Sequence, residues 1–247
     1  MDLRELDTNI TIDHWYYQSK FLAAKDLLIR SATWPSNSKE KVVLGDIGAG
    51  SGLFTKAFHE EFPIPNKTAY AVDLFYPDDM IGNVNGVKFV REIPQGVCPS
   101  HLLLMDILEH IEDDLDLLKK YVDMSIPGSV FVITVPAHRA LWSDHDEFLD
   151  HKRRYTLPEI EQVAIDSGLE ITKSRYFFAA ILPIVFIARK IYEPVLKYLK
   201  IYKYQGMKQP NLVVDFLLKK LLKVEISLGR ANRFVGLTCM VVAKKQG

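Results

Sequence analysis

The chain has 247 residues, of which 48% are apolar, and its 31 basic residues balance 31 acidic ones. This length can bury the core of one enzyme domain, and the zero net charge gives no reason to expect a nucleic-acid partner. The two cysteines, Cys98 and Cys239, lack metal-binding spacing, and no signal peptide is visible at the acidic N-terminus. A reduced cytoplasmic protein is therefore expected.

The first part of the chain predicts a helix followed by a strand–turn–helix unit. Apolar spacing indicates an amphipathic helix over residues 13–31, within an N-terminal helical lid of residues 1–40. The segment KVVLGDIGAGSGLFTKAF, residues 41–58, has the pattern of a buried strand, a glycine-rich turn and a helix. A second apolar strand over residues 68–72 ends at Asp73.

Further strands and helices alternate along the rest of the chain. Strands are predicted at 87–90, 101–105, 130–135, 169–177 and 237–243, and helices at 107–124 and from the capping box at Thr156 to Gly168. Such alternation predicts an α/β fold with a mostly parallel seven-stranded sheet and helices on both faces. The predicted catalytic domain is 41–177 with 235–247, and residues 178–234 form a helical insertion before the last strand.

The glycine turn predicts a nucleoside site. Gly48, Gly50 and Gly52 allow positive φ and let a ligand approach bare backbone, and Asp73 at the next strand end could accept hydrogen bonds from a ribose diol. A dinucleotide site is less favoured because Leu53 stands where that fingerprint needs glycine. The carboxylate of Asp46 also disfavours pyrophosphate and suits a cationic ligand.

These motifs resemble a known family. Residues 46–52, with the pattern D-x-G-x-G-x-G, and the strand ending in Asp73 resemble motif I and the acidic loop of class I S-adenosylmethionine methyltransferases. The segments HWYYQSK, DILEHIEDD and VPAHRALWSDHDEFLDHKRRYT look like a bacterial type 11/23 subgroup, related to the ubiquinone-biosynthesis O-methyltransferases. The resemblance implies a Rossmann-like fold and O-methylation of a small or lipid-linked acceptor.

The resemblance also implies which residues bind S-adenosylmethionine. The aromatic run at residues 14–17 would cover the cofactor, with Tyr16 or Lys20 near its methionine carboxylate, unless Trp15 merely pins the helix to the core. Glu92 is the best candidate for the adenine contact, although the segment around it departs from the family pattern. The expected cofactor-binding residues are Tyr16, Asp46, Gly48, Ala49, Gly50, Gly52, Asp73, Leu74, Glu92 and Asp106.

Methyl transfer needs a group that removes the acceptor's proton, and Asp106, Glu109 and His110 are the first candidates. At spacings i, i+3 and i+4 they would share one face at the start of a helix. His110 could be the general base, or the trio could hold Mg²⁺, as matching positions in the quinone methyltransferases suggest. Alternatively, the carboxylates only favour the helix N-terminus and His110 packs against a loop.

The loop over residues 137–155 supplies the second set of candidates, including His145, His151 and Tyr155 as catalytic residues. It follows a strand at the cofactor edge, where substrate loops are expected. Arg153 or Arg154 could grip an anionic acceptor. They could instead pair with the acidic run at residues 144–150 and hold the loop shut.

The insertion is strongly basic. Residues 175–230 contain eleven Lys/Arg against three Asp/Glu, so they carry a net charge of +8 and the remainder carries −8. They could be solvated helices, or they could form a docking surface for anionic lipid or a pocket for an amphiphilic acceptor. The latter reading places a cytoplasmic protein at the inner face of the membrane. The residues of this predicted docking surface or pocket are Ile181 to Ile187, Arg189, Lys190, Lys197, Lys200 and Lys203.

Two other classes of function remain open from the sequence. One is a non-catalytic nucleoside-binding protein recruited to a membrane as a partner of other enzymes. The other, less favoured, is a dinucleotide-dependent oxidoreductase.

Overall fold

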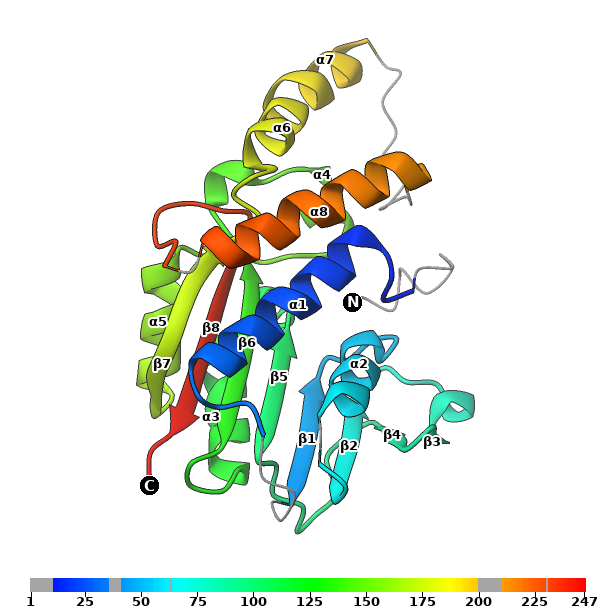
Figure 1. The fold of residues 1–247 in the computed structure, drawn as a ribbon, viewed down its shortest axis with the longest axis vertical. Coiled ribbons are helices and arrows are strands. Elements are labelled where there is room, and N and C mark those ends of the chain that lie inside the picture. Colours follow the sequence, from blue (N-terminus) through cyan, green and yellow to red (C-terminus); the bar gives the residue numbers. More distant parts are fainter. Residues whose placement is uncertain (1–10, 36–40, 63, 200–209, 230) are drawn as a thin grey trace.

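The protein is built on one eight-stranded sheet, seen in a computed structural model that describes residues 11–35, 41–62, 64–199, 210–229 and 231–247. The strand order is β3-β4-β2-β1-β5-β6-β8-β7 (Figure 1). Strands β4, β2, β1, β5 and β6 run parallel, and β8 is antiparallel to both of its neighbours. The strands are β1 (Val42–Ile47), β2 (Lys67–Val72), β3 (Gly82–Val84), β4 (Val87–Val90), β5 (His101–Met105), β6 (Val130–Pro136), β7 (Leu169–Phe177) and β8 (Thr238–Lys245).

The prediction of a mostly parallel α/β sheet is confirmed, but the sheet has eight strands where seven were expected. The additional strand, β3, pairs antiparallel with β4 at the edge of the sheet. All three of its residues are exposed. They therefore lack the apolar alternation by which the other strands are recognised.

Helices cover both faces of the sheet. Helices α1, α2 and α8 lie on one face, where Phe58 and Leu222 belong to the same apolar core, and α3 and α5 cover the other (Figure 1). The α-helices are α1 (Trp15–Arg30), α2 (Leu53–Glu61), α3 (Asp114–Met124), α4 (Asp144–Phe148), α5 (Leu157–Asp166), α6 (Leu182–Ile187), α7 (Glu193–Tyr198) and α8 (Leu212–Leu228). A π-helical turn (Ala188–Tyr192) joins α6 to α7.

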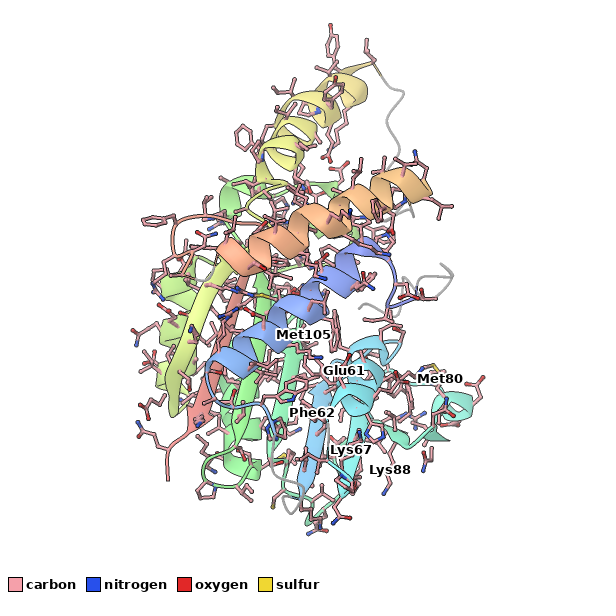
Figure 2. The ribbon with its side chains drawn as sticks, in the orientation of Figure 1. Glu61, Phe62, Lys67, Met80, Lys88 and Met105 are labelled. Carbon is pink, nitrogen blue, oxygen red and sulfur yellow. The ribbon has the colours of Figure 1, made fainter. Side chains whose placement is uncertain are left out.

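Helix α2 is tied back to the sheet at its C-terminal end. The Nζ of Lys67, the first residue of β2, donates a hydrogen bond of 2.7 Å to the Phe62 carbonyl just after α2; both side chains are labelled in Figure 2. Met105, also labelled there, is the last residue of β5 and lies at the carboxyl end of that strand. The carboxyl ends of the parallel strands together form one side of the sheet, and ligand-binding sites in such sheets are found there.

One predicted helix begins later than expected. Residues 107–124 were expected to form one helix, but residues 108–110 form a 3₁₀ turn, Ile111 is extended, and α3 begins only at Asp114. The Asp114 carboxylate accepts a hydrogen bond of 2.6 Å from the Tyr155 hydroxyl, and acidic residues are favoured in the first turn of a helix. Asp106, Glu109 and His110 therefore do not share a helix face.

The predicted helical insertion lies between β7 and β8 and contains α6, α7 and α8. No helix within the described ranges combines the length and hydropathy needed to cross a membrane. The predicted basic residues Lys200 and Lys203 lie outside the described residues, as do residues 1–10 and 36–40 of the predicted lid. The division into lid, catalytic domain and insertion stays a prediction.

Candidate active site

The glycine turn after β1 requires glycine at two positions. Gly48 has φ of 68°, and a Cβ there would lie 2.5 Å from Ile107 Cδ1. Gly52 has φ of 71°, and a Cβ there would lie 2.7 Å from the Phe89 ring. Both backbone conformation and close packing therefore exclude other residues. The turn brings main chain to the carboxyl edge of the sheet without side chains in the way.

Two carboxylates support this turn in different ways. Asp46 is buried and accepts a hydrogen bond of 2.6 Å from Thr55 Oγ1; burial raises its pKa to about 6. Asp73 bridges the two strand tips, because its carboxylate accepts from the Gly50 N–H at 3.2 Å and from the Phe75 N–H at 3.0 Å. Asp46 thus braces the turn from inside, whereas Asp73 faces the space above it.

That space is a cavity of about 550 Å³, called here the larger cavity. Gly48, Asp73, Leu74 and Asp106, four of the predicted cofactor residues, line it. Other predicted cofactor residues lie in or beside the glycine turn. Ala49 and Asp46 are buried, the Gly50 N–H donates a hydrogen bond to Asp73, and Gly52 packs against Phe89. The apolar lining, which was not predicted from the sequence, includes Phe75, Ile107, Leu117 and Tyr121.

The predicted adenine contact, Glu92, does not line this cavity. Its side chain is 70% exposed and lies 4.0 Å from the Lys120 ammonium. Tyr121, which follows Lys120 on α3, lines the cavity instead. An aromatic ring on α3 could only be assigned to the site once the position of α3 against β5 was known.

A partly buried ion pair joins α1 to the tip of β5. Lys20 is fully buried, pairs with Asp106 and donates to the Tyr16 hydroxyl at 3.1 Å, while Thr134 Oγ1 donates to Asp106 at 3.0 Å. Burial opposes both charges, yet the mutual attraction raises the pKa of Lys20 and lowers that of Asp106. Asp106 also has φ of 59°, so the chain turns sharply here.

A smaller cavity of about 320 Å³ lies on the other side of Asp106. It shares Asp106, His110 and Leu149 with the larger cavity, so the two cavities meet at these residues. Its walls come from α1, the loop after β6 and the insertion. The lining residues include Trp15, Tyr16, Tyr17, Glu109, His145, His151, Arg154, Ile181, Val185, Ala188, Arg189 and Glu193.

Asp146 organises the loop that walls the smaller cavity. Its carboxylate accepts two hydrogen bonds from Arg154, at 2.7 and 3.0 Å, and contacts His151 Nδ1 at 2.8 Å. Burial would raise the pKa of Asp146, but the contacts with His151 and Arg154 lower it. The predicted pairing of an arginine with the acidic run is confirmed for Arg154. Arg153 instead lies 3.3 Å from Asp114.

The four predicted catalytic residues differ in their surroundings. His110, His145 and His151 line the smaller cavity; burial and Arg189 lower the pKa of His145 to about 4. Tyr155 does not line either cavity, and its hydroxyl is buried against Asp114. Burial and that hydrogen bond raise its pKa. In this position the side chain anchors the loop to α3, and a catalytic role of Tyr155 stays a prediction.

The cluster of side chains that could hold a metal ion differs from the predicted one. Glu109, His110 and His151 have ligand atoms within 4.8 Å of one another, whereas Asp106 is taken up by Lys20 and Thr134. Neither carboxylate oxygen of Glu109 accepts a hydrogen bond from a described residue, and the side chain is fully buried. Burial, and then Asp106, raise the pKa of Glu109 well above its ordinary value.

No protein-family model matches the chain, and no curated protein matches it. Solved structures do match. With the 1,6-didemethyltoxoflavin-N1-methyltransferase of Burkholderia thailandensis, identity is 17%, the TM-score is 0.52, and 93% of this chain and 79% of that chain are covered. With the plantazolicin methyltransferase BpumL, identity is 14% and the TM-score is 0.54, and 93% of this chain and 84% of that chain are covered. With the cyclase SpnF, identity is 11% and the TM-score is 0.55, and 96% of this chain and 83% of that chain are covered.

At such low identity these likenesses show the fold alone, which is the Rossmann-like fold of S-adenosylmethionine-dependent methyltransferases. The toxoflavin and plantazolicin enzymes were solved with S-adenosylhomocysteine. SpnF shows that the same fold also carries a different reaction. The resemblance to the type 11/23 subgroup stays a prediction.

Proposed function

We propose that this protein is an S-adenosylmethionine-dependent methyltransferase that methylates an oxygen of a small or lipid-linked acceptor. The observation that carries the proposal is the meeting of two cavities at Asp106 and His110. One cavity is formed at a glycine turn and a strand-tip carboxylate, as a nucleoside requires. The other is lined by histidines and aromatic rings, as an acceptor that must lose a proton requires.

The larger cavity has residues that fit the cofactor. Asp73 would accept hydrogen bonds from a ribose diol, the main chain at Gly48 would lie against the ligand, and Tyr121 and Ile107 supply apolar surface for a base. The carboxylate of Asp106, where the cavities meet, suits a positively charged sulfonium. Bound S-adenosylmethionine supplies the electrophilic methyl group and its own leaving group.

His151 is the residue best placed to remove the acceptor's proton. Contact of its Nδ1 with the buried Asp146 carboxylate makes Nε2 the nitrogen that can take a proton, the arrangement by which a carboxylate orients a catalytic histidine. In the smaller cavity its ring lies 4.8 Å, between centroids, from that of His110, which lines both cavities. His145 is a weaker base because its pKa is low.

A second candidate role for the same histidines is to bind a divalent cation. The buried, unpartnered carboxylate of Glu109 beside His110 and His151 favours it, and Asp146 would orient His151 as a ligand. Two imidazoles and one carboxylate suit zinc or manganese better than Mg²⁺. Thermal unfolding with each ion, and after chelation, tests this role: Glu109→Gln should abolish any stabilisation by the ion, and no stabilisation by any of them removes the candidate.

One pair of measurements separates the proposed enzyme from a non-catalytic nucleoside-binding protein. Calorimetric titration with S-adenosylmethionine should show binding in both cases. Only the enzyme should release S-adenosylhomocysteine when a panel of phenolic, sugar and lipid acceptors is supplied. Absence of cofactor binding contradicts both proposals, and tight NADH binding would favour an oxidoreductase instead.

A further inference from the structure

Helix α8 is apolar on two opposite sides. One side packs inward: Leu222 and Ile226 are buried, and the buried Asp215 accepts a hydrogen bond of 3.1 Å from the Trp15 N–H at the start of α1. The opposite side carries a second stripe at helical spacing that no described part of the chain covers. This stripe consists of Val213, Leu217, Leu221, Val224 and Leu228, which are 42–80% exposed.

The segment from α6 to α7 has the same two-sided character. Its inner residues, including Val185 and Arg189, line the smaller cavity. Its outer residues, spaced by three or four along the chain, are Ile184, Ile187, Ile191 and Val195, which are 45–67% exposed. Apolar surface on this scale is unusual for a protein that faces only water.

The exposed charges of α8 beside its outer stripe are positive, whereas Lys197 on α7 pairs with Asp144 of the loop after β6. Lys220 and Lys223 are exposed on α8 and flank its outer stripe at helical spacing. The three acidic residues of the described insertion are engaged elsewhere. Asp215 holds α1, Glu225 accepts hydrogen bonds from the N–H groups of residues 179 and 180, and Glu193 lines the smaller cavity.

We infer that the outer stripes of α8 and of α6–α7 form a docking surface for an anionic lipid bilayer. Helices that lie in the plane of a membrane have an apolar face that enters the headgroup region and lysines that reach the phosphates. The apolar stripe of α8 with exposed Lys220 and Lys223 beside it fits this partner. If the proposed function holds, docking would place the wall of the acceptor cavity at the membrane, where an amphiphilic acceptor is available.

Binding of the full-length protein to vesicles tests the docking surface without any acceptor. The protein should float with vesicles of equal parts phosphatidylcholine and phosphatidylglycerol and not with phosphatidylcholine alone, and salt should weaken the binding. Lys220→Gln with Lys223→Gln should weaken it by about thirtyfold, since each lysine near an anionic surface contributes roughly fivefold. Leu217→Ser and Leu221→Ser should each weaken it by about tenfold.

Matched controls lie on the other face of the sheet. Lys119→Gln on α3 and Ile165→Ser on α5 remove an exposed charge and an exposed apolar side chain, and neither should change vesicle binding. Unchanged cofactor affinity shows that each variant is folded. The inference is overturned if the protein does not float with anionic vesicles, or if Leu217→Ser leaves flotation intact but abolishes self-association, which would identify a second copy as the occupant.

Discussion

The two cavities of the candidate site are built in different ways. The base of the larger one is a single stretch of chain, β1 with the glycine turn, together with Asp73 at the neighbouring strand tip, and its other walls come from residues 106–121 and 149–152. The smaller one is assembled from α1, the loop after β6 and the insertion, which are far apart in the sequence. The difference teaches that the base of the proposed nucleoside side is encoded locally, whereas its other walls and the proposed acceptor side depend on tertiary packing.

The largest expected effect concerns the acceptor side. His151→Asn keeps a donor for Asp146 but cannot take up a proton, so turnover should fall by about 10²–10⁴-fold while cofactor affinity is unchanged. Release of S-adenosylhomocysteine with a competent acceptor measures this. His145→Asn, in the same cavity, should lower turnover by less than about tenfold. The opposite order of the two losses would assign the base to His145.

The second test addresses the joint between the two cavities. Lys20→Met leaves the half-buried Asp106 carboxylate without its charged partner and should reduce the free energy of unfolding by about 3 kcal/mol. Lys25→Met, also on α1, breaks a more exposed pair with Glu61 of α2 and should cost less than about 1 kcal/mol. Urea denaturation measures both. Equal losses would mean that the Lys20–Asp106 pair does not hold α1 on the sheet.

The same ion pair gives the protein a pH dependence in acid. Because the folded-state pKa of Asp106 is lowered, its stabilisation is present above the ordinary carboxyl value of about 4 and is lost as pH falls through the folded value. The Lys20→Met variant should lose less stability over that acid range than the parent protein does.

The third test concerns the local geometry of the turn. Gly48→Ala introduces a Cβ that meets Ile107 at 2.5 Å and a strained φ, and should destabilise the protein by about 2–3 kcal/mol. Gly128→Ala has φ of 80° but no atom within 4 Å, so it should cost about 1 kcal/mol through backbone strain alone. Similar losses at both positions would show that the close packing at Gly48 is not restrictive.

The smallest expected effect is at Asp73, the proposed ribose-binding carboxylate. Asp73→Ala should weaken S-adenosylmethionine binding by about 1–3 kcal/mol through lost charge-assisted hydrogen bonds. The exposed Asp79 is the control, since its replacement by alanine should leave the affinity unchanged. Calorimetry that shows equal affinity for both variants would contradict the role of Asp73.

Local features were predictable from the sequence, and contacts between distant segments were not. The glycine turn, the strand over 87–90 and the capping box at Thr156 depend on neighbours within a few residues, and the structure contains all three. The pairing of Lys20 with Asp106 spans 86 positions, and the hydrogen bond between Tyr155 and Asp114 spans 41. Such contacts decide which polar residues reach the cavity, and no periodicity reports them.

The insertion leaves and re-enters the sheet at adjacent points. β7 and β8 are paired antiparallel neighbours, and the Leu237 N–H donates to the Phe177 carbonyl at 2.9 Å, so topologically the whole segment is the loop of a β-hairpin. The entropic cost of closing a loop rises only with the logarithm of its length. Evolution or protein engineering can therefore lengthen, shorten or exchange this segment, and so reshape the wall of the smaller cavity, while the strand register and the larger cavity, which no described residue of the insertion lines, stay unchanged.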